Sequence, residues 1–138
     1  MRLLLPLLMT VPLALAGAPL AASQPITGRW LTDSKDGIIH IARCGETLCG
    51  RLQRSLVPIE PPGTDIKNPD PALRERRILG LAVLTGLRLE DGKWQGQAYD
   101  PKTGRSYRAV VERVSNEALK VTGCLAIFCR TVTWTRAN

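Results

Sequence analysis

The sequence predicts an all-β domain, a small antiparallel barrel or sandwich of about eight strands. Short runs rich in β-branched and aromatic residues recur along the chain, turn signals separate them, and two cysteine pairs each bracket a hairpin. Periodicity typical of helices is scarce. Many short strands at regular spacing are typical of sandwiches and barrels.

The runs that we expect to form strands are, in order, 28–32, 37–42, 49–56, 79–84, 87–90, 93–99, 105–114, 119–125 and 128–136. The turns between the later runs support this division. Asp91 and Gly92 form the DG pair that favours a tight hairpin turn. The DPKTG segment from Asp100 to Gly104 suits a type I turn closed by a left-handed glycine, and SNEA separates the next two runs.

One long connection interrupts the pattern. Residues 57–80 contain five prolines and a cluster of charges, so they cannot form a central strand. We expect a long proline-rich loop with a short helix over 72–77. Loops of this length are usually functional or mobile, which makes this loop the first place to look for a site.

The four cysteines form two pairs with the same spacing, CGETLC at 44–49 and CLAIFC at 124–129. Cysteines on either side of a hairpin turn can face each other on paired strands, so we predict the disulfides Cys44–Cys49 and Cys124–Cys129. A four-cysteine zinc site is the alternative. A redox centre would have CxxC spacing, which neither segment shows. We expect no metal.

The first 23 residues predict a cleaved signal peptide. Arg2 precedes an apolar run from Leu3 to Ala16, which is short for a membrane span of about 20 residues. Small residues before Gln24 offer a cleavage site, although an earlier cut after Ala16 and an uncleaved anchor are alternatives. We therefore expect residues 24–138 to be one domain, periplasmic or secreted, that does not span the membrane.

The chain is basic, with a formal net charge of +7. Removal of residues 1–23 takes away only Arg2, which leaves 18 basic and 12 acidic residues and a charge of +6. Outside the cytoplasm the available polyanions are lipid head groups, cell-wall polymers and acidic proteins rather than nucleic acid. A role of this charge in solubility alone is the alternative.

Motifs for catalysis are missing from the sequence. His40 is the single histidine, and GxSxG, HExxH, CxxCH and the glycine-rich phosphate loops are absent. Because His40 alternates with isoleucines, we expect it to be a half-buried residue of a strand. Asp65 and Asp100 remain as a carboxylate pair for a hydrolase, but aspartate at a turn usually accepts backbone hydrogen bonds. We expect a protein that is not an enzyme and needs no cofactor.

A basic cluster in the long loop is the strongest polar candidate for a binding site. Arginine forks and lysine there can bind a carboxylate or phosphate if the loop covers a barrel mouth, and two tyrosines flank the neighbouring hairpin turn. A solvated charged face and ordinary packing of the tyrosines are the alternatives. The candidate ligand-binding residues are Asp65, Lys67, Asn68, Arg74, Arg76, Arg77, Tyr99 and Tyr107.

Both ends of the predicted domain carry a further pattern. TGRW contains Gly28 and Trp30, and TWTR contains Trp134 and Arg136. This combination resembles the calycin superfamily of lipocalin-like barrels. The resemblance implies that the first tryptophan closes the barrel floor and that a basic residue from the last strand packs across it. The barrel-closing residues that we expect are therefore Gly28, Trp30, Trp134 and Arg136.

A longer pattern is more specific. Together with GRW and TWTR, the segments CGETLCGRL, DIKNP, RRILGL, WQGQAYDPKTGRSY and LKVTG resemble the bacterial family called domain of unknown function 2147, over residues 27–136. The resemblance implies an exported calycin-like barrel, and it implies no particular activity. It also implies that the cysteine pairs are local reinforcement, because they are not a general property of the family.

Two functions of different classes follow from these expectations. The first is a monomeric binding module for a small amphipathic or anionic ligand. The second is an interaction module that contacts an envelope protein or an anionic lipid surface. Barrels of about eight strands leave room for side chains or one small ligand, so the presence of a cavity distinguishes the two.

Overall fold

The computed structural model describes residues 11–14, 17 and 25–138. Most of the predicted signal peptide, residues 1–23, lies outside the described residues. Among the residues that are described, no helix is long and apolar enough to cross a membrane.

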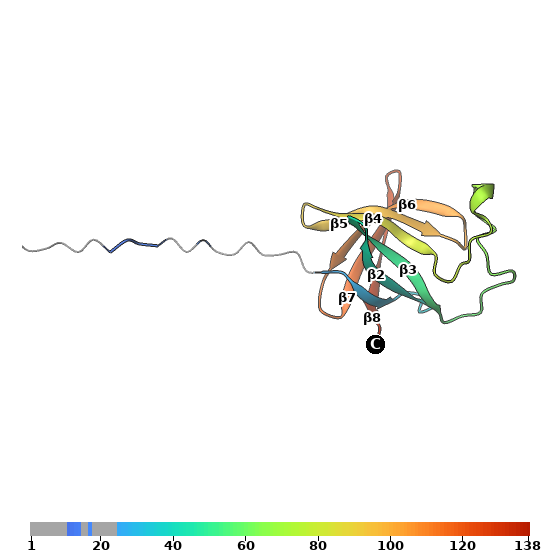
Figure 1. Ribbon diagram of the computed structural model, residues 1–138, viewed down its shortest axis with the longest axis horizontal. Coiled ribbons are helices and arrows are strands. Elements are labelled where there is room, and N and C mark those ends of the chain that lie inside the picture. Colours follow the sequence, from blue (N-terminus) through green and yellow to red (C-terminus); the bar gives the residue numbers. More distant parts are fainter. Residues whose placement is uncertain (1–10, 15–16, 18–24) are drawn as a thin grey trace, which may run out of the picture.

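Eight antiparallel strands form one closed barrel in which each strand pairs with its neighbours in sequence and β8 returns to β1 (Figure 1). The predicted all-β barrel is confirmed, and the sandwich alternative is excluded. The strands are β1 (Gly28–Leu31), β2 (Gly37–Cys44), β3 (Thr47–Ser55), β4 (Ala82–Glu90), β5 (Lys93–Asp100), β6 (Arg105–Arg113), β7 (Ala118–Leu125) and β8 (Phe128–Arg136), with one 3₁₀ turn, η1 (Pro71–Leu73), in the long loop.

Strand β4 corrects the expected division into two runs at 79–84 and 87–90. It is one strand with a register irregularity between Thr85 and Arg88, where Gly86 has a φ of +61°. A Cβ at Gly96 on the neighbouring strand would overlap the carbonyl oxygen of Thr85. The two glycines therefore allow β4 to bulge toward β5 without breaking the sheet.

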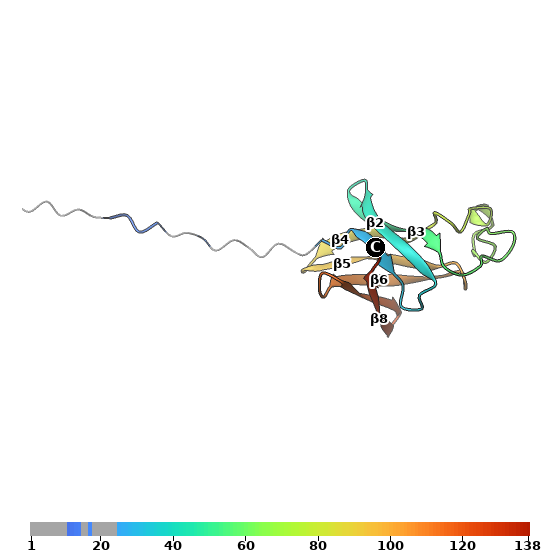
Figure 2. The same cartoon turned by 90° about the horizontal axis from the view of Figure 1, so that it is seen from below.

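The up-and-down order gives the barrel two different ends. Connections 32–36, 56–81, 101–104 and 126–127 lie at one end, which we call the open end. The other end, called the closed end, carries connections 45–46, 91–92 and 114–117. Figures 1 and 2 both show the long loop extending beyond the strands at the open end.

Trp30 and Arg136 form the floor of the closed end. The Trp30 side chain is fully buried, and its Nε1 donates a hydrogen bond to the Ile26 carbonyl oxygen at 2.9 Å. The Arg136 guanidinium lies 4.1 Å from the centroid of the Trp30 ring. Glycine suits position 28 beside it, because its φ of +126° is one that other residues rarely adopt and a Cβ there would crowd the guanidinium. The arrangement implied by the calycin resemblance is confirmed for these three residues.

The core consists of inward-facing strand residues, among them Ile39, Ile41, Leu84, Leu87, Val111 and Leu119. His40 lies between two of these residues but is exposed. The expectation of a half-buried histidine was therefore wrong. Successive strand side chains point to opposite faces, and the outer face of β2 is open to solvent at this position.

Both predicted disulfides are present, and all four cysteines are used, so the zinc alternative is excluded. Cys124 and Cys129 lie directly opposite each other, with their Cα atoms 4.1 Å apart. Cys44 and Cys49 are diagonal, because Cys44 pairs with Thr47, and their Cα atoms are 5.5 Å apart. In each hairpin the ladder continues past the disulfide, so the turn has two residues rather than the expected four. Two-residue turns are the commonest connection in tight hairpins.

We expect Trp30→Ala to lower the free energy of unfolding by about 3–5 kcal/mol, because it leaves a cavity in the barrel floor and removes the ring under Arg136. Urea denaturation measures this loss. His40→Ala is the matched control on the neighbouring strand, where removal of an exposed side chain changes stability by less than about 0.5 kcal/mol. Equal effects of the two substitutions would contradict the role of Trp30 as the floor of the barrel.

Candidate functional site

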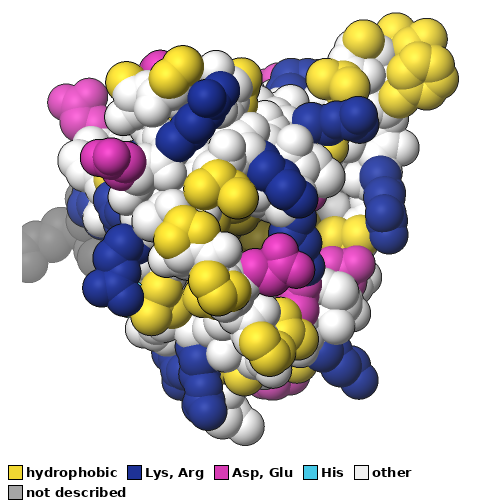
Figure 3. Space-filling view, turned by 90° about the vertical axis from the view of Figure 1, so that its right-hand side faces the viewer, with side chains coloured by type: hydrophobic (Ala, Val, Ile, Leu, Met, Phe, Trp, Pro, Cys, Tyr) yellow, Lys and Arg dark blue, Asp and Glu magenta, His cyan; other side chains and the backbone are white. Residues whose placement is uncertain are grey.

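A cavity of about 840 Å³ opens at the open end of the barrel. Strand side chains supply an apolar part of its lining, and the long loop adds further apolar residues. In Figure 3, which faces this end, hydrophobic side chains gather among acidic and basic ones. The apolar strand residues that line the cavity are Ile39, Leu52, Val83, Val121, Val132 and Trp134. The barrel interior is therefore only partly filled by side chains.

Charged residues of both signs also line the cavity. The acidic ones are Asp33, Asp36, Glu60 and Asp100, and the basic ones are Lys67, Lys102 and Arg130. They come from the turns, the long loop and the end of a strand. With nearly equal numbers of each sign, the cavity does not have the strongly positive lining that would select a simple anion.

Asp65 organises the long loop. Its side chain is fully buried and accepts three hydrogen bonds: from Tyr99 Oη at 2.5 Å, Asn68 Nδ2 at 2.8 Å and Arg76 Nη2 at 3.1 Å. Its backbone N–H donates to the Arg76 carbonyl oxygen at 2.9 Å, and its own carbonyl oxygen accepts from the Asn68 N–H. One carboxylate thus joins two segments of the loop, at Asn68 and at Arg76, to Tyr99 on strand β5.

The environment of Asp65 keeps the carboxylate ionised. Burial alone would raise its pKa, but the hydrogen bonds from Tyr99, Asn68 and Arg76 outweigh burial and lower the pKa below its ordinary value. Burial and the hydrogen bond to Asp65 raise the pKa of Tyr99 to about 12, so the phenol remains a donor. The group is a fully satisfied buried network, which stabilises structure.

The long loop is also fixed to the β5–β6 hairpin. Lys67 Nζ donates to the Lys102 carbonyl oxygen at 2.8 Å. The Lys67 carbonyl oxygen lies so close to Gly104, whose φ is +74°, that a Cβ at this position would overlap it. Gly104 therefore has two roles. It closes the DPKTG turn, as predicted, and it allows the long loop to pack closely against the hairpin.

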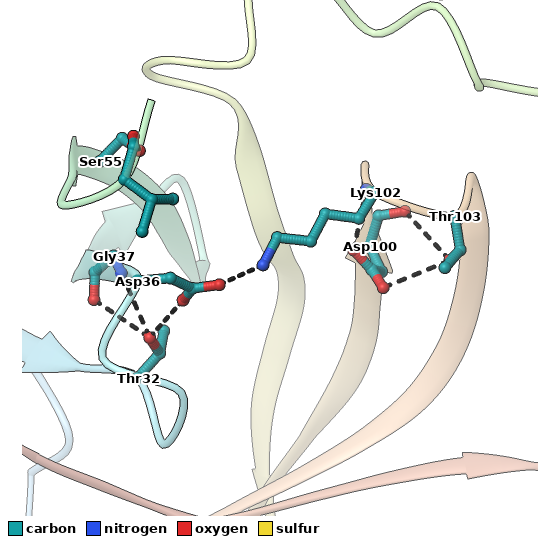
Figure 4. A network of polar contacts seen from close by, with 8 residues as sticks. Thr32, Asp36, Gly37, Ser55, Asp100, Lys102 and Thr103 are labelled. Atoms are coloured by element: carbon teal, nitrogen blue, oxygen red, sulfur yellow. Dashed lines mark hydrogen bonds and ion pairs between the residues drawn. The ribbon is translucent and has the colours of Figure 1, made fainter. Parts of the chain in front are cut away.

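A second ion pair links two turns at the open end. Lys102, in the β5–β6 turn, reaches to Asp36, in the β1–β2 turn, and Thr32 Oγ1 donates to the other Asp36 oxygen at 2.7 Å (Figure 4). Burial raises the pKa of Asp36, but hydrogen bonds led by that from Lys102 lower it to about 2. The hydrogen bond to Asp36 raises the pKa of Lys102. Both residues line the cavity, so this pair is part of its mouth.

The structure divides the predicted ligand-binding residues into two groups. Lys67, Tyr99 and Tyr107 line the cavity, whereas Asp65 and Asn68 are buried in the hydrogen-bond network within the loop.

The three predicted arginines do not line the cavity. Arg74 Nε donates to the Asn68 carbonyl oxygen at 2.7 Å, Arg76 pairs with Asp65, and Arg77 forms an isolated bridge with Thr64. Trp134, expected at the barrel floor, is buried in the core and lines the cavity.

Asp65 and Asp100 have separate structural partners. Asp65 is inaccessible to solvent within its network, and Asp100 Oδ1 accepts a hydrogen bond from the Lys102 N–H at 2.9 Å. The Asp100 carbonyl oxygen also accepts from the Gly104 N–H at 2.8 Å. These contacts are those of turn and loop aspartates, the alternative to a catalytic pair.

Several lining residues were not predicted from the sequence. Asp36 and Lys102 are 66 residues apart, and Arg130 precedes the apolar inward residues Val132 and Trp134 on β8. No local motif connects Asp36 to Lys102. The alternation Arg130, Val132, Trp134 is the one signal that would have placed Arg130 on the inner face.

A closed eight-stranded antiparallel barrel with a cavity at one end and a tryptophan–arginine floor at the other is a lipocalin-like barrel. Residues 28–136 match the family described as "Uncharacterized protein conserved in bacteria (DUF2147)", and the chain belongs to this family.

A solved structure from Helicobacter pylori, protein HP1028, described as belonging to the lipocalin family, is similar to this chain with a TM-score of 0.71 and 21% sequence identity. The similarity covers 83% of this chain and 84% of that one. At this identity the likeness shows a shared fold. The comparison with curated proteins gave no match.

We expect Asp65→Ala to lower the free energy of unfolding by about 1–3 kcal/mol, because it leaves buried donors of Tyr99 and Asn68 without their acceptor. Hydrogen exchange should accelerate over residues 63–78. Asp70→Ala is the matched control: this exposed loop aspartate caps η1, and its loss costs less than about 1 kcal/mol. Unchanged exchange in Asp65→Ala would contradict the anchoring role.

The Asp36–Lys102 pair predicts a specific acid dependence. The folded pKa of Asp36, about 2, lies below the ordinary value of 3.8, so its stabilising effect is present above about pH 4 and is lost as pH falls toward 2. Asp36→Asn should therefore be less stable than wild type at neutral pH, and the difference should shrink over this interval.

The size of this difference is on the order of 1 kcal/mol, because the Lys102 side chain is 70% exposed and solvent screens the pair. Urea denaturation at a series of pH values measures it. Asp91→Asn, in a turn at the closed end, is the control that removes one carboxylate elsewhere. A difference between wild type and Asp36→Asn that stays constant from pH 5 to pH 2 would contradict the assignment.

Proposed function

We propose that this protein is a non-catalytic binding module that holds a small amphipathic ligand. The observation that carries the proposal is the cavity of about 840 Å³ at the open end. Ligand sites are typically concave, mostly apolar and about 300–1,000 Å³ in volume. The lipocalin-like fold supports the proposal, since barrels of this size can hold one small ligand.

The lining favours an amphipathic ligand over a simple anion. Apolar side chains such as Val121, Val132 and Trp134 suit a hydrocarbon or ring system, whereas charged groups of both signs line other parts of the cavity. In the described part of the chain no ion pair involves Arg130, so this cation is available to an acidic head group. Lys67 Nζ already donates to the Lys102 carbonyl oxygen, but an ammonium group has further N–H donors for the same head group. An arginine can bind such a group with two parallel hydrogen bonds.

The proposal places the protein in the periplasm or outside the cell. Two disulfides in a domain of this size are typical of oxidising compartments. The predicted signal peptide at residues 1–23 supports the same location. In such a compartment the available amphiphiles include lipids and their breakdown products, which have the mixed chemistry of the cavity.

Gly123 provides a direct test, because it lines the cavity and a Cβ there would meet Tyr107 at 3.7 Å, an ordinary contact. We expect Gly123→Leu to fold normally and to weaken binding of the amphipathic probe anilinonaphthalene sulfonate by about tenfold or more, since the new side chain occupies the apolar part of the site. Energy transfer from tryptophan to the bound probe measures the affinity.

Thr133→Leu is the matched control. It introduces the same side chain on β8 at an exposed position between the inward-facing Val132 and Trp134, and we expect it to bind the probe as wild type does. Native mass spectrometry of the protein from its own compartment should show an added mass that leaves on unfolding and that Gly123→Leu lacks. Equal probe affinity in all three proteins would refute the cavity as the binding site.

A further inference from the structure

The tip of the β7–β8 hairpin is apolar and exposed to solvent. Leu125 is 51% exposed, Ile127 is 88% exposed and Phe128 is 76% exposed. We call residues 125–128 the apolar tip. Turns of two-residue hairpins normally carry polar or glycine residues, so this composition calls for a reason outside the folding of the hairpin.

The other disulfide hairpin shows that the apolar residues are not needed for this architecture. The Cys44–Cys49 hairpin has the same cysteine spacing, and its two-residue turn is Gly45–Glu46. Gly45 there adopts a φ of +67°, whereas the corresponding turn residue of the apolar tip, Ala126, is held at +53° without the freedom of glycine. Local rules are usually broken at functional positions.

The apolar tip stands on a rigid base. Cys124 and Cys129 are directly paired one residue below it on each strand, and their disulfide closes the hairpin. A group that is already held in one conformation loses little entropy when it binds. The disulfide therefore lowers the conformational entropy that Ile127 and Phe128 would lose on insertion into an apolar layer.

Basic side chains flank the apolar tip. Arg108 on β6 pairs in register with Cys124, Arg130 on β8 pairs with Gly123, and both are exposed. Figure 3 shows an apolar protrusion at its upper right with basic side chains below it. Apolar groups next to cations match the boundary between the acyl chains and the anionic head groups of a membrane.

The apolar tip also lies at the open end of the barrel. Gly123 and Arg130, directly below it, line the cavity. A protein held by the apolar tip would thus have its cavity next to the surface to which it binds.

From this geometry we propose that the apolar tip is a membrane-docking element, which inserts Ile127 and Phe128 into an anionic lipid surface while Arg108 and Arg130 contact the head-group phosphates. A lipid surface is favoured over a protein partner because three protruding side chains make a small patch, whereas stable protein interfaces involve about 20–30 residues on each side. The net charge of +6 that remains after removal of residues 1–23 adds to the attraction.

The test uses the oxidised protein and vesicles of phosphatidylglycerol and phosphatidylethanolamine, with phosphatidylcholine vesicles as the neutral comparison. We expect sedimentation with the anionic vesicles, weaker binding at high salt, and about tenfold or greater loss of binding in the double variant Ile127→Ser, Phe128→Ser. Arg108→Gln should weaken binding and reduce its salt dependence.

Matched tryptophan variants report insertion directly. Phe128→Trp should show a blue shift on addition of anionic vesicles and quenching by brominated acyl chains, whereas Glu46→Trp, on the polar hairpin, should show neither. Thermal unfolding checks that the substitutions leave the fold intact, as their exposure implies.

Vesicle binding that is equal in wild type and the double variant would overturn the proposal, as would an absence of binding to anionic vesicles. Crosslinking from the tip to a protein without vesicle binding would also overturn it. Because Gly123→Leu blocks the cavity and leaves the apolar tip in place, it should bind vesicles normally, so failure of docking and failure of ligand binding are separate results.

Discussion

Closure of the barrel depends on a short seam between its first and last strands. Strand β1 has four residues, and only Trp30 and Leu31 pair with β8 in register. Two ladder pairs are few for an edge that must remain closed, so side chains have to reinforce it. Trp30 and Arg136 are both a register pair and a stacked cation–π pair. The same two residues therefore close the sheet and fill its floor, which allows the opposite end of the barrel to remain open.

At the open end the buried Asp65 network has the corresponding role. The connection from β3 to β4 is the longest in the barrel, and a mobile loop of that length would cover or fill the cavity. Asp65 binds donors from the loop and from Tyr99 on β5, which holds the loop as a wall of the cavity. Lys102 and Asp36 extend this wall across the mouth. The basic residues of the loop are mostly used in this scaffold, and for that reason few of them are available to a ligand.

The sequence predicted the features that arise from local chemistry. The hairpin turns at Asp91–Gly92 and Asp100–Gly104, both disulfides and the barrel itself depend on residues close together in the chain or on the alternation of strands. The ion pair at the mouth of the cavity could not be predicted in the same way, because Asp36 and Lys102 become neighbours only after the barrel closes. The single strand β4 was missed for a related reason: Gly86 resembles a turn residue, and only the close approach of Gly96 shows that it forms a bulge within a continuous strand.

The two disulfide hairpins lie at opposite ends of the barrel, and their turns differ in polarity. The closed end carries the polar Gly45–Glu46 turn, and the open end carries the apolar tip beside the cavity. If the disulfides served only stability, nothing would favour an apolar turn at one end and a polar turn at the other. An exposed apolar tip also makes aggregation easier, a disadvantage that selection would tend to remove from a position without a use. This difference between the two ends therefore indicates that the open end, which carries the cavity and the apolar tip, is the binding face of the molecule.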